Sequence, residues 1–469
     1  MKNNKYHIYF LIIIIGGFLF VPPPKQAYAA GNTYYIDATN GNDTNLGTST
    51  DAAWKTILKV NASSFSPGDN IYFKRGEVWR EQLTFPSSGS SGNPITIGDY
   101  GEGTKPTIYG SSLLNGTWTQ YSGNIYNISL TTEAKTVLNG TSNLTLNEGN
   151  YGSLSNNQWD WYNNKLYVNI GLDPTGGNIE AGQRNLGIYC ENKNYITIED
   201  IIIRNTNNEG VRFDGTSNNI IVNNVESYSN ANDGFKQYNT SNVTYNNIIG
   251  SYNLDDGFSL HDSAVATINT GTFNNNATGI DNITNSQIIA DNITFSNNSP
   301  RNGLHIGGSA GGASIITNSS FSDNNDAAIY INESPSVIMS NITISGGTTG
   351  LGLGLGTSGA ITVSNIIITN SDRGISLGGS GNISISDATI TGGKYGLLGA
   401  GSISVADLSS FTISGQSINN IFWGTNSSGL TLSDSEIYNS SSTLVSISSA
   451  SMTIENTKIH DAPLPQSMV

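Results

Sequence analysis

Four ionisable side chains lie close together in the stretch YNLDDGFSLHDS, residues 252–263. Asp255 and Asp256 are adjacent and precede a glycine, and His261 and Asp262 follow after an alternating segment. Crowded carboxylates repel each other, which either raises a carboxyl pKa for acid–base chemistry or creates a site for a hard cation with oxygen ligands. Asp-Asp-Gly is also a common solvated turn. The neighbouring chain must therefore show whether this cluster has a chemical role.

The cluster belongs to an internal repeat that starts at Tyr195, with lines such as YITIEDIIIRNTNNEGVRFDGTS and NVTYNNIIGSYNLDDGFSLHDSA. The period is roughly 22 to 25 residues, and apolar residues alternate inside each line, which is typical of parallel β-helix coils. A propeller is the architectural alternative, but its blades need about forty residues or more. The sequence therefore predicts an all-β, right-handed parallel β-helix, with the hand taken from the general rule for parallel crossovers.

Two columns of residues recur once in each predicted coil. The first is nearly all glycine: Gly210, Gly234, Gly257, Gly279, Gly303, Ala328, Gly350, Gly374 and Gly396. The second lies earlier in each line and is nearly all Asn or Asp: Asp200, Asn224, Asn247, Asn292, Asn318, Asn341, Asn365 and Asp387, with Thr270 as the exception. Asn and Asp tolerate the left-handed backbone of a sharp turn, and their side chains can form a hydrogen-bonded ladder. We expect this second column to be structural.

After the glycine column, each coil has a strand whose alternate residues face solvent. The outward positions are Arg212, Lys236, Ser259, Asp281, His305 and Tyr330, and two residues further on Asp214, Tyr238, His261, Ile283, Gly307 and Asn332. Consecutive coils stack about 4.8 Å apart, so these side chains form one surface. Ionisable groups gather on the early coils, whereas GLGLGLG, residues 350–356, offers only glycines outward. Simple solvation would not concentrate the charges in this way.

Composition limits the partners that this surface can have. A formal charge of −15 argues against nucleic acid and against an anionic membrane surface. It also makes an acidic polysaccharide an awkward ligand unless bound cations or a local basic patch reverse the field. Cys190 is the only cysteine, so an intrachain disulfide is excluded. We expect a monomeric protein whose partner is a polysaccharide. A bound divalent cation is one way in which an acidic polysaccharide could be accommodated.

The chain divides into five predicted segments. Residues 1–29 have a basic start, the apolar core IYFLIIIIGGFLFV and the small-residue site AYA of a secretory signal, with a retained membrane anchor as the alternative. Residues 30–110 are predicted to form an N-terminal cap and the first coils, with AAWKTILKV, residues 52–60, as a capping helix. An inserted β subdomain at 111–185, coils at 186–460 and a tail at 461–469 follow. We expect a secreted protein with no membrane contact after signal cleavage.

The segments YYIDATNGNDTNLGTSTDAAWKTI, PGDNIYFKRGEVWR and GNPITIGDYGEGTKPTI, followed by the coils, resemble secreted bacterial right-handed β-helix proteins related to pectate lyases. The resemblance covers nearly the whole mature chain. More narrowly, NDGF followed one coil later by DDGFS is similar to family 9 polysaccharide lyases, in which an Asp and a DDGFD segment bind calcium and a lysine is the base. The resemblance implies Asp233, Asp255 and Asp256 as calcium ligands. Ser259 stands where that family has its last Asp, which implies a weaker site.

The base is less clearly marked, because the family's downstream lysine is missing. Lys236, Arg301 or His305 would have to replace it, and His261 also lies on the predicted surface. Removal of the proton next to a uronate carboxylate needs a cation to neutralise that carboxylate and a positioned base. The sequence thus predicts a calcium-assisted lyase of uronate-containing polysaccharide.

Two other functions remain open at this point. A polygalacturonase-like hydrolase could use Asp233, Asp255 and Asp256 as acid and water-activating base, although the Gly-His-Gly and Arg-Ile-Lys segments of that family are absent. A non-catalytic glycan-binding surface protein would need the surface alone. The two enzymatic functions depend on successive coils bringing the three acids together.

Overall fold

The computed structural model describes residues 31–461, apart from gaps at 240–242, 309–311, 334–335, 355–358, 379–380, 400–404, 425–429 and 449–450. The predicted signal segment, residues 1–29, and nearly all of the predicted tail, residues 461–469, lie outside the described residues. In the described part of the chain, no helix has the length and apolar character needed to span a membrane.

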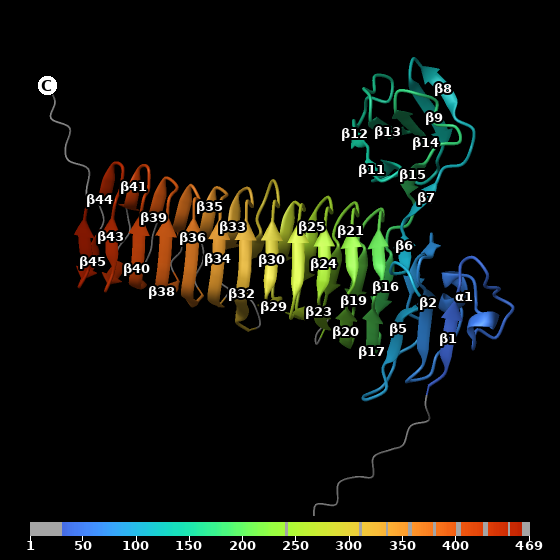
Figure 1. Ribbon diagram of the computed structural model, residues 1–469, viewed down its shortest axis with the longest axis horizontal. Helices are drawn as coiled ribbons and strands as arrows, with labels where there is room; N and C mark the ends of the chain where they lie inside the picture. The colour runs from blue at the N-terminus through green and yellow to red at the C-terminus, as the bar shows by residue number, and fades with distance from the viewer. Residues whose placement is uncertain are drawn as a thin grey trace, which may run out of the picture. The chain divides into compact units, whose positions relative to one another are not determined.

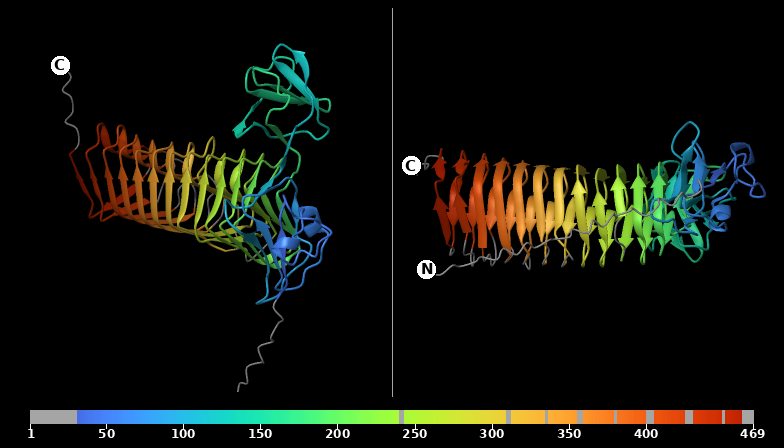
Figure 2. Two further views of the ribbon diagram at one scale, coloured as in Figure 1. Left: turned by 45° about the vertical axis from the view of Figure 1, so that its right-hand side comes forward. Right: turned by 90° about the horizontal axis from the view of Figure 1, so that it is seen from below.

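Parallel strands stack coil upon coil along the described solenoid (Figures 1 and 2). One face, here called the front sheet, has thirteen strands among the described residues. They are β4 (Leu83–Thr84), β16 (Ile188–Glu191), β19 (Val211–Asp214), β22 (Phe235–Tyr238), β25 (Asp256–His261), β28 (Thr278–Asn282), β31 (Leu304–Ile306), β33 (Ala327–Ile331), β35 (Thr349–Leu353), β37 (Arg373–Leu377), β39 (Tyr395–Gly399), β41 (Asn419–Trp423) and β44 (Thr443–Ile447). This arrangement confirms the predicted parallel β-helix.

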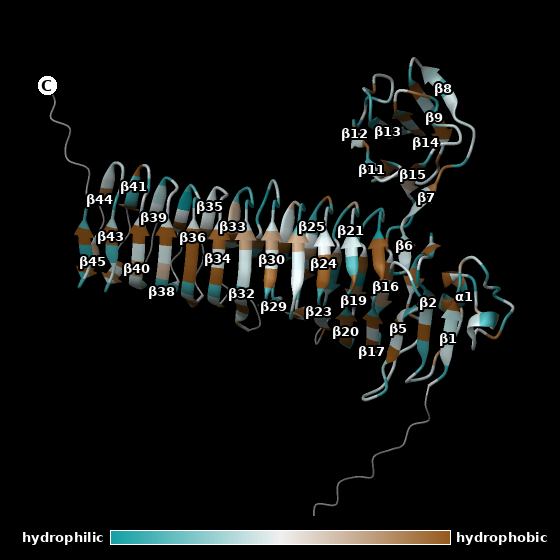
Figure 3. Cartoon of the chain, in the orientation of Figure 1, coloured by the Kyte–Doolittle hydropathy of each residue, from teal (hydrophilic) through white to brown (hydrophobic). Residues whose placement is uncertain are grey.

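The remaining strands of the solenoid pair in a larger sheet. They are β1 (Thr33–Ile36), β2 (Asn70–Lys74), β3 (Val78–Trp79), β5 (Ile95–Tyr100), β6 (Thr107–Tyr109), β17 (Asn194–Glu199), β18 (Ile202–Arg204), β20 (Asn218–Asn223), β21 (Glu226–Tyr228), β23 (Val243–Asn246), β24 (Ile248–Ser251), β26 (Val265–Ile268), β27 (Gly271–Asn274), β29 (Gln287–Asp291), β30 (Ile293–Ser296), β32 (Ser314–Ser322), β34 (Val337–Ser345), β36 (Ile361–Thr369), β38 (Asn382–Thr391), β40 (Val405–Ser414), β42 (Leu430–Ser433), β43 (Glu436–Tyr438), β45 (Met452–Glu455) and β46 (Lys458–His460). Apolar residues recur along the strands of both sheets (Figure 3).

The front sheet alternates inward and outward side chains as the repeat predicts. The residues directly before the first row of predicted outward positions point inward and are each at most 1% exposed: Val211, Phe235, Phe258, Ile280, Leu304 and Ile329. Equivalent residues of successive coils pair directly, as Phe235 does with Phe258 and Phe258 with Ile280. Because each coil covers the apolar row of its neighbour, the core runs without interruption along the stack.

The predicted Asn/Asp column forms the turns as expected. Its eight members all have a positive φ between 50° and 57°. Their side chains also hydrogen-bond up the stack: the Asn247 amide donates to Asn224 Oδ1 at 2.8 Å, and the Asn365 amide donates to Asn341 Oδ1 at 2.8 Å. Both parts of the structural interpretation are confirmed.

A second, buried asparagine ladder lies at the turn that leads into the front sheet. It consists of Asn230, Asn253, Asn276, Asn298 and Asn324, each at most 3% exposed. From Asn253 onward, each side-chain carbonyl accepts both the backbone N–H and the side-chain amide of the asparagine one coil earlier, as Asn276 Oδ1 does from Asn253 at 2.9 and 3.1 Å. At the start of the ladder, Asn230 Oδ1 accepts from the backbone N–H and the hydroxyl of Thr206. This ladder was not among the columns predicted from the repeat. The ladder supplies hydrogen-bond partners for polar groups that these turns bury and that strand pairing does not satisfy.

The N-terminal segment caps the solenoid, although its helix is shorter than predicted. The helix α1 covers only Ile57–Asn61, and a 3-10 turn η1 (Thr50–Ala52) precedes it. Residues 53–56 between them are not helical, since Ala53 and Thr56 have extended backbone and Trp54 bridges Ile36. Ile57 and Val60 are fully buried in the main core. The helix therefore covers the open end of the core with two apolar side chains rather than with a long amphipathic face.

The segment between the first coils and the main run of coils has its own β structure and its own core. Its strands are β7 (Ser111–Leu113), β8 (Thr119–Ser122), β9 (Ile125–Ser129), β10 (Val137–Asn139), β11 (Ser142–Asn143), β12 (Thr145–Leu146), β13 (Gln158–Tyr162), β14 (Lys165–Asn169) and β15 (Ile179–Gly182). Trp118, Trp159 and Leu166 belong to a hydrophobic cluster separate from the main core. Residues 111–185, which the interrupted repeat predicts to be an inserted β subdomain, thus contain strands and a hydrophobic cluster of their own.

Asp37 ties the end of β1 to the next coil. Its carboxylate accepts the backbone N–H groups of Thr39 and Asn40 at 3.0 and 2.8 Å, and the ammonium of Lys74 at 2.7 Å. Burial of Asp37 raises the carboxyl pKa, but these hydrogen bonds outweigh it and lower the pKa to about 2.

We predict that replacing one rung of the buried ladder strongly destabilises the solenoid. Asn276→Ala leaves the two donors of Asn253 without an acceptor, and this should lower the free energy of unfolding by about 3 kcal/mol. Urea denaturation followed by circular dichroism measures the loss. Asn341→Gly is the matched control, because Asn341 is exposed and glycine tolerates its turn; it should cost less than about 1 kcal/mol. Equal losses in the two variants would contradict a special role for the buried ladder.

We predict that the contribution of Asp37 depends on acid pH. Its pKa is lower in the folded protein than the ordinary value of 3.8, so its stabilising effect is complete above about pH 4 and is lost as the pH falls toward 2. Asp37→Asn should therefore lower the Tm relative to the wild type at neutral pH. The difference in Tm should shrink between pH 4 and pH 2. A constant difference across that range would show that charge on Asp37 is not the stabilising feature.

Candidate functional site

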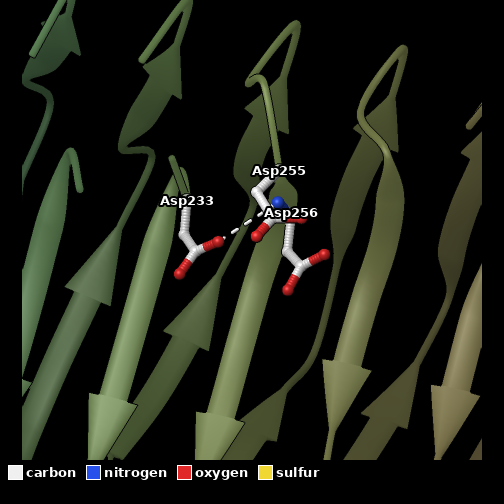
Figure 4. A group of neighbouring side chains, drawn as sticks. All are labelled: Asp233, Asp255 and Asp256. Atoms are coloured by element: carbon white, nitrogen blue, oxygen red, sulfur yellow. Dashed lines mark hydrogen bonds between the residues drawn. The ribbon is translucent and has the colours of Figure 1, made fainter. Parts of the chain in front are cut away.

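Asp233, Asp255 and Asp256, the acid cluster, meet where two coils enter the front sheet. Asp233 precedes β22 and Asp256 begins β25, one coil further on. An oxygen from each of the three carboxylates can be chosen so that all lie within 4.8 Å of one another (Figure 4). The oxygens are thus brought together as the sequence analysis required.

The glycine column explains why the acids of successive coils come so close. A Cβ at Gly234 would lie 2.7 Å from the carbonyl oxygen of Gly257 and 2.7 Å from the Asn253 amide nitrogen. Only glycine allows the coils to approach in this way. The backbone N–H of Asp256 donates to Asp233 Oδ1 at 3.1 Å, the bond drawn in Figure 4. Backbone packing therefore sets the spacing of the acids.

Burial makes the charges on these acids costly. Asp233 is 0% exposed and Asp256 is 4% exposed, whereas the side chain of Asp255 is 38% exposed. Burial raises the pKa of Asp233 to about 6, although Lys236 and the backbone N–H of Asp256 oppose the rise. Burial, together with the charges of Asp233, Asp281 and Asp255, raises the pKa of Asp256 well above its usual range.

One oxygen of Asp256 has no hydrogen-bond partner. Asp256 Oδ1 is buried, and the Arg301 guanidinium is 3.8 Å away from it, too far for a hydrogen bond. Buried polar atoms are almost always satisfied, so an orphaned carboxylate oxygen beside two further carboxylates requires a proton or a cation.

Two basic side chains contact the acid cluster. Lys236 Nζ lies 2.7 Å from Asp233 Oδ2 and 3.9 Å from Glu209 Oε1. Burial lowers the pKa of Lys236, but the neighbouring Asp233 raises it by more, so the ammonium stays protonated. Arg301 Nη1 lies 2.6 Å from Asp255 Oδ1, and the Arg301 side chain is 56% exposed. Lys236 and Arg301 are thus the cations in direct contact with the acid cluster, and Glu209 lies 3.9 Å from both Lys236 and Arg212.

The remaining predicted residues lie outside this contact group. Ser259 Oγ is 2.8 Å from His261 Nε2, and the His261 ring stacks on Tyr238 at 4.8 Å between centroids. Burial, followed by the charge of Lys236, lowers the pKa of His261, so its imidazole is neutral near neutral pH. The Ser259–His261 pair is therefore separate from the acid cluster.

His305 belongs to another pair, two coils beyond β25. Its Nδ1 lies 2.6 Å from Asp281 Oδ1, and its Nε2 lies 3.1 Å from Asn332 Oδ1. Burial lowers the pKa of His305, but Asp281 raises it by more, which favours an imidazolium. His305 thus acts as a partner of Asp281 and makes no described contact with the three acids.

Glu209 and Asp281 are the residues that the sequence analysis did not select. Glu209 is 2% exposed and precedes Gly210, just as Asp233 and Asp256 precede their own glycines. The register of the coils therefore stacks the three buried acids Glu209, Asp233 and Asp256. The signal was present in the glycine column, because an acid precedes three successive members of it.

Comparisons with known proteins agree with this fold. A family model described as "Right handed beta helix region" matches residues 283–418. The structure of XylC in complex with xylose is 11% identical, with a TM-score of 0.53, and the match covers 90% of this chain and 86% of that chain. The pectate lyase Pel9A is 15% identical, with a TM-score of 0.49, and the match covers 81% of this chain and 79% of that chain.

A curated relative also matches part of the chain. Lacto-N-biosidase of Bifidobacterium longum subsp. longum is 36% identical over 106 residues, which is 21% of this chain. The match spans only 7% of the length of that relative. The likeness to the XylC structure shows the fold alone, and the family model names its hand over the residues that it matches. The described chain is therefore a right-handed parallel β-helix.

Proposed function

We propose that this protein binds a uronate-containing polysaccharide on the front sheet and cleaves it by β-elimination with a bound Ca²⁺. The observation that carries the proposal is the acid cluster, in which three carboxylates converge and a buried Asp256 oxygen lacks a partner. The solved relatives whose names refer to xylose and to pectate lyase, and the curated lacto-N-biosidase, are all named for sugars or for glycan-active enzymes. They support a carbohydrate ligand in general.

The residues of the acid cluster fit a hard cation. All of their donors are oxygens, which Ca²⁺ prefers, and Asp256 Oδ1 is free to bind. Asp233, Asp255 and Asp256 would be the protein ligands, whereas Ser259 Oγ is directed to His261. When bound, the cation would neutralise a substrate carboxylate and so acidify the adjacent carbon.

Lys236 is the best-placed candidate for the base, which must lose its own proton before it can accept one from the substrate. Arg301 also lies beside the acids, but a guanidinium does not lose its proton in proteins. His261 is neutral, yet it lies five positions beyond Asp256 along β25, roughly 16 Å at the usual rise of a strand. Lys236 Nζ contacts Asp233 directly, and this ion pair keeps the ammonium protonated. Lys236 can therefore act as a base only when Asp233 binds another partner in place of the ammonium. Arg301, exposed at the edge of the acid cluster, would then orient the substrate carboxylate.

A hydrolase remains the second candidate because of one observation, the raised pKa of Asp256. A buried, protonated carboxyl group is what a glycosidase needs as its general acid. The close approach of the acids argues against an inverting hydrolase, which needs about 6.5–9.5 Å between its carboxyl groups to accommodate water. The third candidate, a non-catalytic glycan-binding protein, requires neither β-elimination nor hydrolysis. For all three we propose a secreted location, because polysaccharides of this class lie outside the cell.

We predict that Ca²⁺ binds to the acid cluster. Isothermal titration calorimetry should show binding to the wild type and at least about tenfold weaker binding to Asp256→Asn, a loss of about 1.4 kcal/mol. Asp372→Asn is the matched control, because Asp372 is an exposed acid already paired with Lys394, and it should bind Ca²⁺ like the wild type. Unchanged affinity in Asp256→Asn would remove the cation site from the proposal.

We predict lyase activity on polygalacturonate or alginate that chelator abolishes. The ultraviolet absorbance of unsaturated product ends measures it, and Lys236→Ala should lower the rate by about 100-fold or more because it removes the base. Lys165→Ala, an exposed lysine of the inserted subdomain, should leave the rate unchanged. New reducing ends without unsaturation would show a hydrolase instead. Retention without cleavage would show a binding protein.

A further inference from the structure

A hollow opens on the front sheet beyond the ionisable residues of the early coils. Its volume is about 500 Å³, and its lining includes Asp326, Tyr330, Thr349, Gly352, Arg373 and Ser376. The outward positions of the sheet pair in the order His305, Tyr330, Gly352, Ser376. The row of large outward side chains is therefore interrupted after Tyr330 by a glycine and a serine, and it resumes at Leu398.

The aromatic ring of Tyr330 forms one wall of this hollow. The ring stacks on His305 with centroids 5.6 Å apart and an angle of 24° between the planes. On its other side it lies against the glycines of the next coil: a Cβ at Gly352 would come within 3.2 Å of Tyr330 Cδ2, and a Cβ at Gly354 would clash with the Tyr330 hydroxyl. The glycines of the next coil thus add no side chains to this surface, and the Tyr330 side chain takes up part of the space that such side chains would fill. The rest of that space is the hollow, which the Tyr330 side chain borders. We call this space the glycine slot.

Arg373 provides the charge at the far side of the glycine slot. It is exposed, and among the described residues it has no carboxylate partner, whereas Lys394 on the following coil is paired with Asp372 at 2.6 Å. In the backbone register of the front sheet, Arg373 lies opposite Thr349 of the preceding coil. Arg373 directly precedes Gly374 of the glycine column, just as Asp256 directly precedes Gly257. It lies five coils from Asp256, which at about 4.8 Å per coil is roughly 24 Å.

We infer that the glycine slot is a second binding site for an acidic sugar unit, in which the pyranose ring stacks on Tyr330 and Arg373 binds the carboxylate. An aromatic face and a flat backbone floor accept a sugar ring, and an unpaired guanidinium forms bidentate hydrogen bonds with a carboxylate. The inference rests on the proposed function, because it assigns the slot to a distant unit of the same acidic polysaccharide. An extended chain lying along the coils would reach both the acid cluster and Arg373.

This site can be tested by measuring sugar binding under conditions in which the proposed cleavage does not occur. In chelator, where the acid cluster holds no Ca²⁺, the wild type should still bind a uronate oligosaccharide long enough to span the coils, as measured by isothermal titration calorimetry. Tyr330→Ala and Arg373→Gln should each weaken this binding by about tenfold. Ser376→Phe should also weaken it, because the new ring fills the glycine slot while Tyr330 and Arg373 remain. Lys165→Gln is the control for loss of positive charge and should bind like the wild type.

The outcomes separate this inference from the proposed function. If all three slot variants bind like the wild type, the second site is wrong, whatever the enzymatic activity. If they weaken binding while the wild type cleaves no polymer, the slot stands and the lyase proposal fails. A neutral oligosaccharide of equal length should bind more weakly than the acidic one, and Arg373→Gln should leave its affinity unchanged. Equal loss for neutral and acidic sugars in Arg373→Gln would overturn the carboxylate assignment.

Discussion

Coil-on-coil backbone hydrogen bonding is the constraint on which this structure depends. Each front-sheet strand pairs in parallel with the strand of the next coil, so equivalent residues repeat at the spacing of neighbouring strands, about 4.8 Å. The turns between strands bury polar groups that this pairing does not satisfy. The asparagine ladder from Asn230 to Asn324 supplies their partners inside the protein. Where strand pairing and the asparagine ladder are both present, they hold neighbouring coils at a constant spacing.

The same constraint creates the electrostatics of the site. A solenoid places side chains of the same column next to each other regardless of their charge, because backbone pairing sets the distance. Glu209, Asp233 and Asp256 are therefore buried in one stack, and Lys236 is the cation in closest contact with it. Burial and mutual repulsion raise the carboxyl pKa values of Asp233 and Asp256. The fold thus holds together a group of acids that would separate in a flexible loop.

The front sheet changes in character along its length. Acids, Lys236 and the two histidine pairs occupy the early coils, and then the aromatic and glycine residues of the slot follow, with Arg373 beyond them. This order places negative charge at one end of a continuous row and an unpaired positive charge further along it. For a protein with a formal charge of −15, such a local basic group matters to any acidic ligand.

The sequence by itself determined the period, the glycine column, the left-handed Asn/Asp turns and the alternation of the front sheet, because each follows from backbone geometry that repeats along the chain. It placed the start of α1 too early, since the residues before Ile57 are not helical. Only the tertiary structure decided which asparagines are buried, that Glu209 joins the acids, that Lys236 turns back to Asp233, and that His305 pairs with Asp281. These choices depend on side-chain orientation and on competition among charges from different coils, and sequence spacing does not specify either of them.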